Sequence, residues 1–132
     1  MANYTVLNLR EVENSAEKFG YAPAMSARFA SGDLGLEKSG VSLQGLAPGV
    51  RAPFGHREEW QEELYVVVSG SGRVKIDDEI VDFKQWDIFR MAPGVWRCFE
   101  AGADGAEVIA FGAPKMDDPK ADSPMEPGWW SD

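Results

Sequence analysis

The sequence predicts an all-β fold built from short antiparallel strands, arranged as a sandwich or a barrel. First, 14 Gly and 8 Pro are spread between short apolar runs, as in chains with many tight turns. Second, apolar and polar residues alternate at period two between Ser69 and Phe83, as in a strand with one buried face. The runs also follow one another too closely for the helical crossovers of a parallel sheet. A chain of 132 residues is long enough for one domain with one core.

The predicted strands are short runs rich in β-branched and aromatic residues, each bounded by turn-forming residues. In chain order they are Tyr4–Leu9, Ser26–Ala30, Gly40–Leu46, Glu63–Ser69, Arg73–Asp77, Glu79–Phe83, Asp87–Met91, Val95–Glu100 and Ala106–Phe111. The polar, mildly amphipathic segment Glu11–Phe19 predicts a short helix. The triplet Asp77-Asp78-Glu79 predicts a hairpin turn.

The composition of the chain changes near residue 113. Residues 1–112 are predicted to form a single barrel domain, and 113–132, rich in Pro and Asp, an extended arm outside the sheet. The arm ends with the adjacent Trp129 and Trp130. Because an indole ring buries a large apolar area when it docks, we expect one of the two to pack on the body or on a second subunit.

The charge of the chain excludes several classes of partner. The net charge is −9, with 22 acidic against 13 basic residues, so nucleic acids and anionic membrane surfaces lack the basic footprint they require. A single cysteine, Cys98, excludes an internal disulfide and fits a reducing compartment. The chain shows neither a secretory leader nor an apolar run of membrane-spanning length, so a cytoplasmic location is expected.

The only histidine, His56, stands among acidic residues at the entrance of an apolar, β-branched run that ends at Gly70. Histidine and carboxylate side chains together are typical of metal or acid–base sites. Over about residues 49–70 the spacing resembles the first motif of the cupin family, His-x-His-x4-Glu-x6-Gly. His56, Glu63 and Gly70 are in register, and Glu58 stands at the place of the second histidine.

A weaker second match lies at about residues 86–101, where the family has Gly-x5-Pro-x-Gly-x2-His-x3-Asn. Pro93 and Gly94 supply the turn, and Asp87 matches a residue that often follows the family's glycine. Four positions depart from the pattern, with Gly, Pro, His and Asn replaced by Trp86, Ala92, Arg97 and Ala101. The resemblance implies a small single-domain cupin, a double-stranded β-helix in which two antiparallel sheets form a jelly-roll-like barrel.

The resemblance also implies where a site would lie. In cupins, two histidines and a glutamate of the first motif and a histidine of the second hold a divalent metal in the barrel mouth. Carried over by position, this set is His56, Glu58, Glu63 and Arg97. A guanidinium group stays protonated and offers only donors, so Arg97 cannot be a ligand and would repel a metal ion. His56, Glu58 and Glu63 remain as candidate ligands for Mn, Fe, Zn or Ni. The alternative is no metal, with Arg97 bridging one carboxylate and His56 protonated beside the other.

Three functions are compatible with such a barrel. The first is binding of a small polar or anionic metabolite in the barrel mouth. Arg97 would anchor the anion, and the other predicted ligand-binding residues are His56, Glu58, Gln61, Glu63 and Tyr65. The second is an enzyme, either a metal-dependent oxygenase or isomerase, or a metal-independent sugar isomerase or epimerase. In the metal-independent form, His56 or Tyr65 would transfer the proton and Arg97 would stabilise an oxyanion.

The third function is a structural dimer module whose pocket is vestigial. The resemblance implies pairing through sheet faces or through swapped terminal strands, for which residues 4–9 are a candidate, and a homodimer is expected.

Each site residue also has a purely structural interpretation. His56 can be a loop residue at the rim, the acidic run 58–63 a solvated loop, and Arg97 a group that only neutralises Glu63. Trp86 and Trp96 are expected in hydrophobic packing. Cys98 is expected to be an inert core thiol, because nothing near it in the sequence would lower its pKa.

Overall fold

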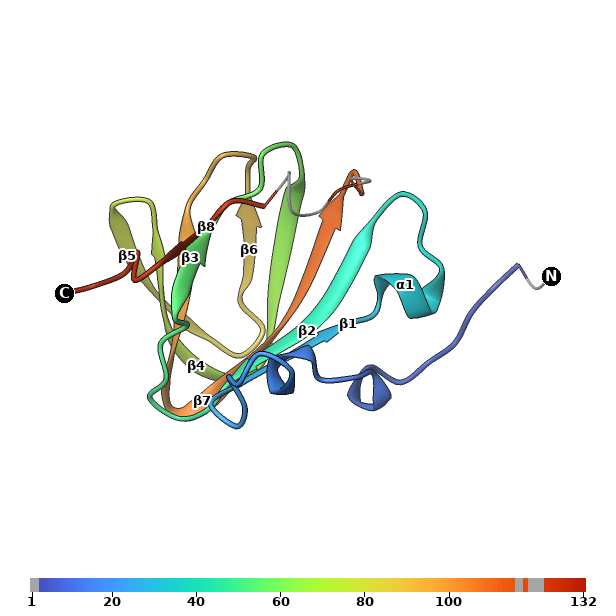
Figure 1. Ribbon diagram of the computed structural model, residues 1–132. Coiled ribbons are helices and arrows are strands. Elements are labelled where there is room, and N and C mark those ends of the chain that lie inside the picture. The colour runs from blue at the N-terminus through green and yellow to red at the C-terminus, as the bar shows by residue number, and fades with distance from the viewer. Residues whose placement is uncertain (1–2, 116–117, 119–122) are drawn as a thin grey trace.

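The computed structural model describes residues 3–115, 118 and 123–132 of the chain, and every strand pair in this part is antiparallel (Figure 1). The strands are β1 Met25–Phe29, β2 Gly40–Leu46, β3 Phe54–His56, β4 Glu62–Ile76, β5 Glu79–Lys84, β6 Ile88–Met91, β7 Arg97–Ala113 and β8 Met125–Pro127. Helical structure is limited to the 3₁₀ turns η1 Leu9–Glu11 and η2 Ser15–Glu17 and the short α-helix α1 Ser31–Leu34. The predicted all-β class is confirmed.

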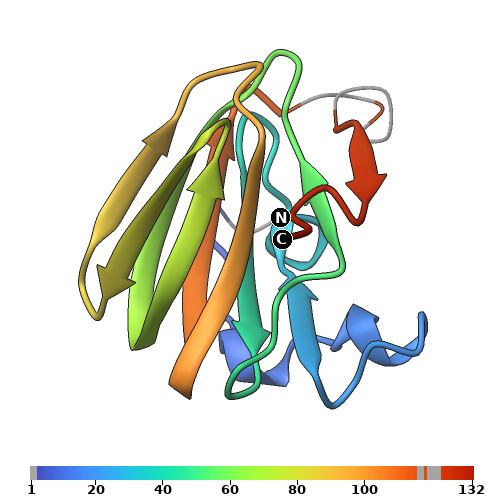
Figure 2. The same cartoon turned by 90° about the vertical axis from the view of Figure 1, so that its left-hand side faces the viewer.

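Two long strands, β4 and β7, pair with each other along most of their length and form the centre of the sheet. The first half of β4 also pairs with β6 and its second half with β5, whereas β7 pairs with β3 at its start and with β2 towards its end. The sheet therefore curls back over itself, as the view in Figure 2 shows. Gly70 lies at a register shift in the β4–β7 ladder with φ of 77°, and a Cβ there would lie 1.9 Å from the Gly105 carbonyl oxygen. Only glycine fits this bend.

The sequence divides each long strand in two, and this prediction is wrong. Glu63–Ser69 and Arg73–Asp77 belong to the single strand β4, and the last two predicted strands belong to β7. The glycines between them bend the strands at bulges instead of ending them. The hairpin turn at Asp77 and Asp78 is confirmed, since β5 begins at the next residue. The short strand β3 was not predicted.

Two N-terminal predictions are also wrong. Residues 4–8 form no strand, because none of the described strands pairs with them, and Tyr4 and Val6 are 77% and 84% exposed. The segment Glu11–Phe19 contains only the end of η1 and the single turn η2 in place of a helix. Asn14 stabilises a turn here in place of a longer helix, because its side-chain oxygen accepts hydrogen bonds from the amides of Ala16 and Ala27.

The C-terminal arm returns to the barrel, so the prediction that it stays outside the sheet is wrong for β8, which pairs with β3. Residues 116–117 and 119–122 of the arm lie outside the described residues, and the domain boundary at residue 112 stays a prediction. The expected docking of the tryptophans is confirmed. Trp130 is 5% exposed, with the Arg51 guanidinium 4.1 Å from its ring centroid, and Trp129 stacks on Trp96.

The core lies between the two layers of the curled sheet. Its buried members are Tyr65, Val67, Val74, Phe83, Met91, Ala101, Ala106, Val108 and Ala110. Cys98 is buried, and burial raises the pKa of its thiol to about 11, as expected of an inert residue. The predicted packing of Trp86 is wrong, because this residue occupies a tight turn with φ of 74° and is 69% exposed. Among the described residues, no helix has the length and apolar content needed to cross a membrane.

Candidate functional site

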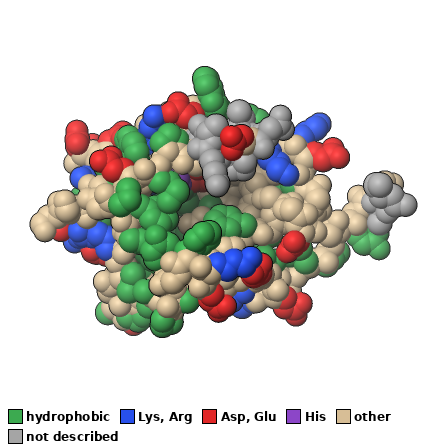
Figure 3. All heavy atoms as spheres, in the orientation of Figure 1, with side chains coloured by type: hydrophobic (Ala, Val, Ile, Leu, Met, Phe, Trp, Pro, Cys, Tyr) green, Lys and Arg blue, Asp and Glu red, His purple; other side chains and the backbone are tan. Residues whose placement is uncertain are grey.

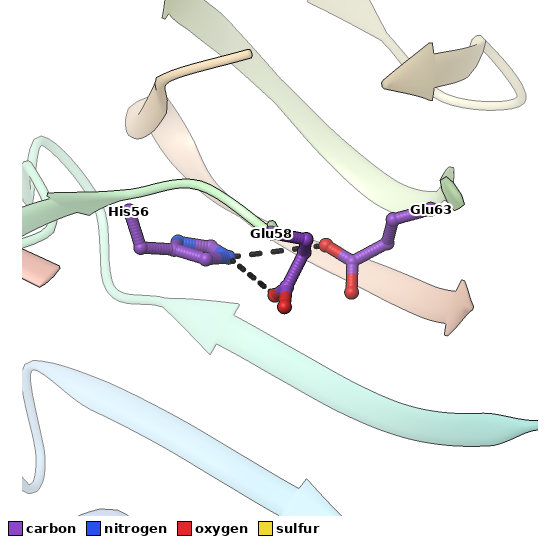
Figure 4. Close-up of side chains that lie close together, drawn as sticks. All are labelled: His56, Glu58 and Glu63. Carbon is purple, nitrogen blue, oxygen red and sulfur yellow. Dashed lines mark ion pairs between the residues drawn. The ribbon is translucent and has the colours of Figure 1, made fainter. Parts of the chain in front are cut away.

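Three strands bring the predicted site residues together inside the barrel. His56 ends β3 and lies opposite Arg97, the first residue of β7. Glu63 and Tyr65 both point inward from β4, where buried and less buried residues alternate. Glu58 lies in the connection between β3 and β4. Figure 4 shows the His56 ring pointing toward the Glu58 and Glu63 carboxylates.

The imidazole is enclosed by oxygen atoms. His56 Nε2 lies 3.5 Å from Glu58 Oε1, 3.8 Å from Glu63 Oε1 and 3.4 Å from the Tyr65 hydroxyl. The Glu58 and Glu63 side chains are 8% and 11% exposed. The interpretation of residues 58–63 as a solvated loop is therefore wrong for these two glutamates, whereas Glu62 is exposed as expected.

Arg97 is 1% exposed, and three of its nitrogens are engaged. Nη2 donates to Glu63 Oε1 at 2.8 Å, Nε donates to the Tyr65 hydroxyl at 3.2 Å, and Nη1 donates to the Val95 carbonyl at 2.7 Å. A buried carboxylate paired with a guanidinium and further hydrogen bonds satisfies both charges. The predicted pairing of Arg97 with Glu63 is confirmed.

The ionisation of these groups follows from burial and from their neighbours. Burial opposes the charge on His56, but hydrogen bonds to Glu58 and Glu63 outweigh it and raise the pKa of the imidazole. Burial likewise opposes the charge on Glu63, yet the His56 hydrogen bond and the Arg97 charge lower the pKa of its carboxyl. Burial, followed by the charge of Glu63, raises the pKa of Tyr65 well above its usual value. The cluster therefore favours imidazolium, carboxylate and neutral phenol together.

This polar cluster borders a cavity of about 620 Å³, within the range of small-molecule sites. Its walls come from β1, β2 and β7, and His56, Glu58, Glu63 and Arg97 all line it. Figure 3 shows the face of the molecule seen in Figure 1, where hydrophobic side chains gather. The cavity combines a polar corner with largely apolar walls.

The family assignment rests on the central part of the sequence. A family model described as "Cupin domain" matches residues 42–111, more than half of the chain. The chain is a cupin. The expected double-stranded β-helix agrees with this assignment. No curated protein matches the sequence.

Solved structures similar to this cupin span several activities. A cupin protein from Bacteroides fragilis has a TM-score of 0.71 and 24% identity, with the match covering 89% of this chain and 90% of that one. An oxalate decarboxylase variant from Bacillus subtilis has a TM-score of 0.72 and 21% identity over 92% of this chain and 33% of that one. The nucleoside dehydratase Pac13, from Streptomyces, has a TM-score of 0.69 and 16% identity over 96% and 92%. At these identities the likeness shows the fold alone.

Cupins often bind metals, and three groups of this cupin can hold one. Ligand atoms of His56, Glu58 and Glu63 all lie within 4.8 Å of one another. The place of a fourth ligand is taken by Arg97, whose Nη2 shares Glu63 Oε1 with the site. One imidazole and two carboxylates form a hard donor set suited to Mn²⁺, but a fixed positive charge 2.8 Å from one donor oxygen opposes any cation. The spacing of the three ligand atoms is compatible with a metal ion, but the positive charge of Arg97 opposes one.

Two further residues, Gln61 and Ser123, connect the site to the C-terminal arm. Gln61 borders the cavity, but its Nε2 donates to the Pro114 carbonyl at 3.3 Å, so it also ties β4 to the start of the arm. Ser123, which sequence reasoning missed, donates a hydrogen bond to Glu58 Oε2. Because Ser123 lies 65 residues from Glu58, no local sequence signal predicts this contact.

His56 gives a prediction for the effect of pH on stability. Its pKa is higher in the folded state than the value of about 6.5 in an unfolded chain, so its contribution is complete below about pH 6.5. This contribution is lost as the pH rises through the folded-state pKa. We therefore expect the free energy of unfolding, measured by urea denaturation, to fall more steeply above about pH 6.5 in the wild type than in His56→Gln. Parallel pH profiles would contradict this assignment.

Proposed function

We propose that this cupin binds a small polar molecule in the barrel cavity, with the polar cluster of His56, Glu58, Glu63, Tyr65 and Arg97 recognising its polar group. The observation that supports the proposal is the cavity of about 620 Å³, which is lined by four buried or half-buried ionisable side chains, those of His56, Glu58, Glu63 and Arg97. A site with a few polar groups in a mostly apolar cavity is the usual form of a small-molecule pocket.

Filling the cavity tests this function. Ala27 on β1 borders the cavity, so Ala27→Phe places a ring inside it. The matched control is Ala103→Phe, which adds the same ring at an exposed position of β7. We expect native mass spectrometry and a thermal-shift screen of metabolites to find ligands that bind the wild type and Ala103→Phe but not Ala27→Phe. Ligands that bind all three forms equally would remove the cavity from the proposal.

For the resting state of the site we propose that no metal is bound and that Arg97 supplies the positive charge. The alternative is a divalent ion, Mn, Fe, Zn or Ni, held by His56, Glu58 and Glu63, where it would act as a Lewis acid. Equilibrium dialysis of the untagged protein against each ion should leave far less than one metal per chain. The double variant Glu58→His with Arg97→His restores the family's ligand types and should bind more. Stoichiometric metal in the wild type would favour the alternative.

A second candidate function is metal-independent proton-transfer catalysis. The contact that favours it is the 3.4 Å approach of His56 Nε2 to the Tyr65 hydroxyl beside the cavity. The similarity to Pac13 is compatible with an enzyme but carries no substrate to this chain. If the protein is such an enzyme, His56→Gln should abolish turnover of any substrate found in the screen. Undiminished turnover by this variant would remove the mechanism.

We also propose that the chain forms a homodimer through the outer face of β6, β4 and β7. On this face Leu64 lies opposite Phe111, and Val66 lies opposite both Ile88 and Ile109. Ile88 and Phe111 are 62% and 42% exposed. The N-terminal segment leaves the body (Figure 1), and its Tyr4 and Val6 side chains are exposed. Each copy therefore offers an apolar arm and an apolar face, which a twofold pair can bury together.

The dimer predicts a clear effect of charge on this face. Ile88→Glu combined with Phe111→Glu should convert the dimer to a monomer, as measured by analytical ultracentrifugation. Glu79→Lys, an exposed change in the hairpin between β4 and β5, is the control and should leave the dimer intact. A wild-type monomer would contradict the proposal, and with it the idea that the chain is a structural dimer module.

A further inference from the structure

Trp86 occupies an unfavourable position in the turn between β5 and β6. Its φ is 74°, in the left-handed region that glycine adopts freely and a bulky residue adopts only with strain. Its ring is 69% exposed and, within the described part of the chain, makes no aromatic or cation–π contact. Glycine is the residue of the cupin motif at this place. A tryptophan kept here against strain and exposure points to a contact outside the single copy.

Three hydrogen bonds fix the backbone of this turn. The Trp86 amide donates to the Val67 carbonyl at 2.7 Å. Asp87 closes the turn on Lys84, because its amide donates to the Lys84 carbonyl at 3.1 Å and its Oδ2 accepts from the Lys84 amide at 2.9 Å. The left-handed residue is therefore held in place before any partner binds, and such preorganisation lowers the entropic cost of a contact.

A row of cross-strand neighbours crosses the sheet next to this turn. Paired in order from β6 to β1, its members are Ile88, Val66, Ile109, Leu43 and Arg28. Directly opposite residues of neighbouring strands lie on the same face of a sheet. The row is bare at the β6 end, where Ile88 is 62% exposed, and covered at the β1 end, where Leu43 is 5% exposed. The cover comes from the N-terminal part of the chain, since Arg28 donates to the Val12 carbonyl.

The N-terminal segment and Trp86 lie at opposite edges of this layer. Its strand order is β1, β2, β7, β4 and β6, and Trp86 directly precedes β6. Residues 3–8 extend away from the body on the side of α1 (Figure 1), with Tyr4 and Val6 exposed by 77% and 84%. Two such layers that face each other about a twofold axis along their strands place each N-terminal segment over the β6 edge of the other copy.

We propose that Trp86 anchors an interface between two copies of this chain, with its ring packed on the partner's Tyr4 and Val6. This inference rests on the homodimer proposed above and names the contact that holds it. A tryptophan that becomes buried between subunits is a frequent hot spot of binding. The contact removes three exposed apolar side chains from water on each side of the twofold axis and offsets the strain at Trp86.

Dimer dissociation constants measured by analytical ultracentrifugation test the anchor. Trp86→Gly should raise the dissociation constant at least about tenfold, which corresponds to about 1.4 kcal/mol. The matched control is Trp60→Ala, which removes an indole ring that is 65% exposed in the connection between β3 and β4 and should leave the constant unchanged. If Trp86→Gly dimerises as tightly as the wild type, the role of Trp86 is wrong although the homodimer stands.

A double-mutant cycle identifies the group on which the ring packs. Tyr4→Ser combined with Val6→Ser removes the apolar side chains of the N-terminal segment and should also weaken the dimer. Because the ring and the segment are in contact, Trp86→Gly should weaken the dimer less in this background than in the wild type. Additive effects would exclude the N-terminal segment as the occupant.

The stability of a single copy separates a role in binding from a role in folding. In the background of Ile88→Glu with Phe111→Glu, Trp86→Gly relieves the strain, so the midpoint of urea denaturation should be at least as high as without it. A lower midpoint would show that Trp86 serves the fold and would overturn the inference. A wild-type monomer would remove the proposed homodimer and this inference together.

Discussion

Replacing Arg97 by methionine should lower the free energy of unfolding by about 3–5 kcal/mol, because it leaves the buried Glu63 carboxylate without its cationic partner. The guanidinium is 1% exposed and its Nη2 lies 2.8 Å from Glu63 Oε1. The same change removes the donors to the Tyr65 hydroxyl and to the Val95 carbonyl. Urea denaturation monitored by tryptophan fluorescence measures the loss.

A double variant shows whether this loss comes from the unpaired charge. Arg97→Met combined with Glu63→Leu removes both partners, so it should recover a large part of the stability lost in the single variant. Arg90→Met, at an exposed position of β6, is the control for removing an arginine and should change the stability by less than about 0.5 kcal/mol. A single variant as stable as the control would contradict the role of Arg97 as the charge partner of a buried carboxylate.

Replacing Trp130 by alanine should cost about 3 kcal/mol of unfolding free energy, the usual scale for removing a buried large side chain. Trp130 is 5% exposed and packs beneath two cations, with the guanidinium carbons of Arg51 and Arg73 at 4.1 Å and 5.1 Å from its ring centroid. Arg51 also donates to the Trp130 carbonyl, so ring and backbone hold the chain end together. Thermal and urea denaturation both report this loss.

The chain contains its own control for this change. Trp86→Ala removes a ring that is 69% exposed in a turn and should have little effect on stability. If Trp130→Ala were equally mild, the docking of this ring would not stabilise the fold.

The parts of the fold predicted from the sequence are those encoded by local patterns. Period-two alternation placed Glu63, Tyr65 and Val67 on the same inward face of β4, and all three are buried. The spacing between His56 and Gly70 led to the cupin resemblance, which the family match confirms. From Glu63 to Gly70 the spacing works because these residues lie on the single strand β4, in which sequence distance fixes the face on which a side chain lies.

The parts missed depend on contacts between distant segments. Glu58 looks like a member of a charged surface run, and its burial arises from the fold around it, including the hydrogen bond from Ser123. The glycines at 70 and 105 read locally as turns, because a bulge inside a long strand and a turn between two strands need the same backbone freedom. Strand β8 was missed since a segment of three residues ending in proline carries little strand signal of its own.

The pairing of β8 with β3 also has a kinetic consequence. β8 is short, its three residues are exposed, and β3 is its only partner among the described strands, so we expect it to open at a lower free energy than the central strands β4 and β7. Met125, on this strand, borders the cavity, and Ser123, just before it, holds Glu58. Separation of the two strands opens a route into the barrel and frees Glu58 at the same moment. Under the proposed binding function, we expect the lifetime of a bound ligand to depend on how often this edge opens, and amide hydrogen exchange at β3 measures the same opening.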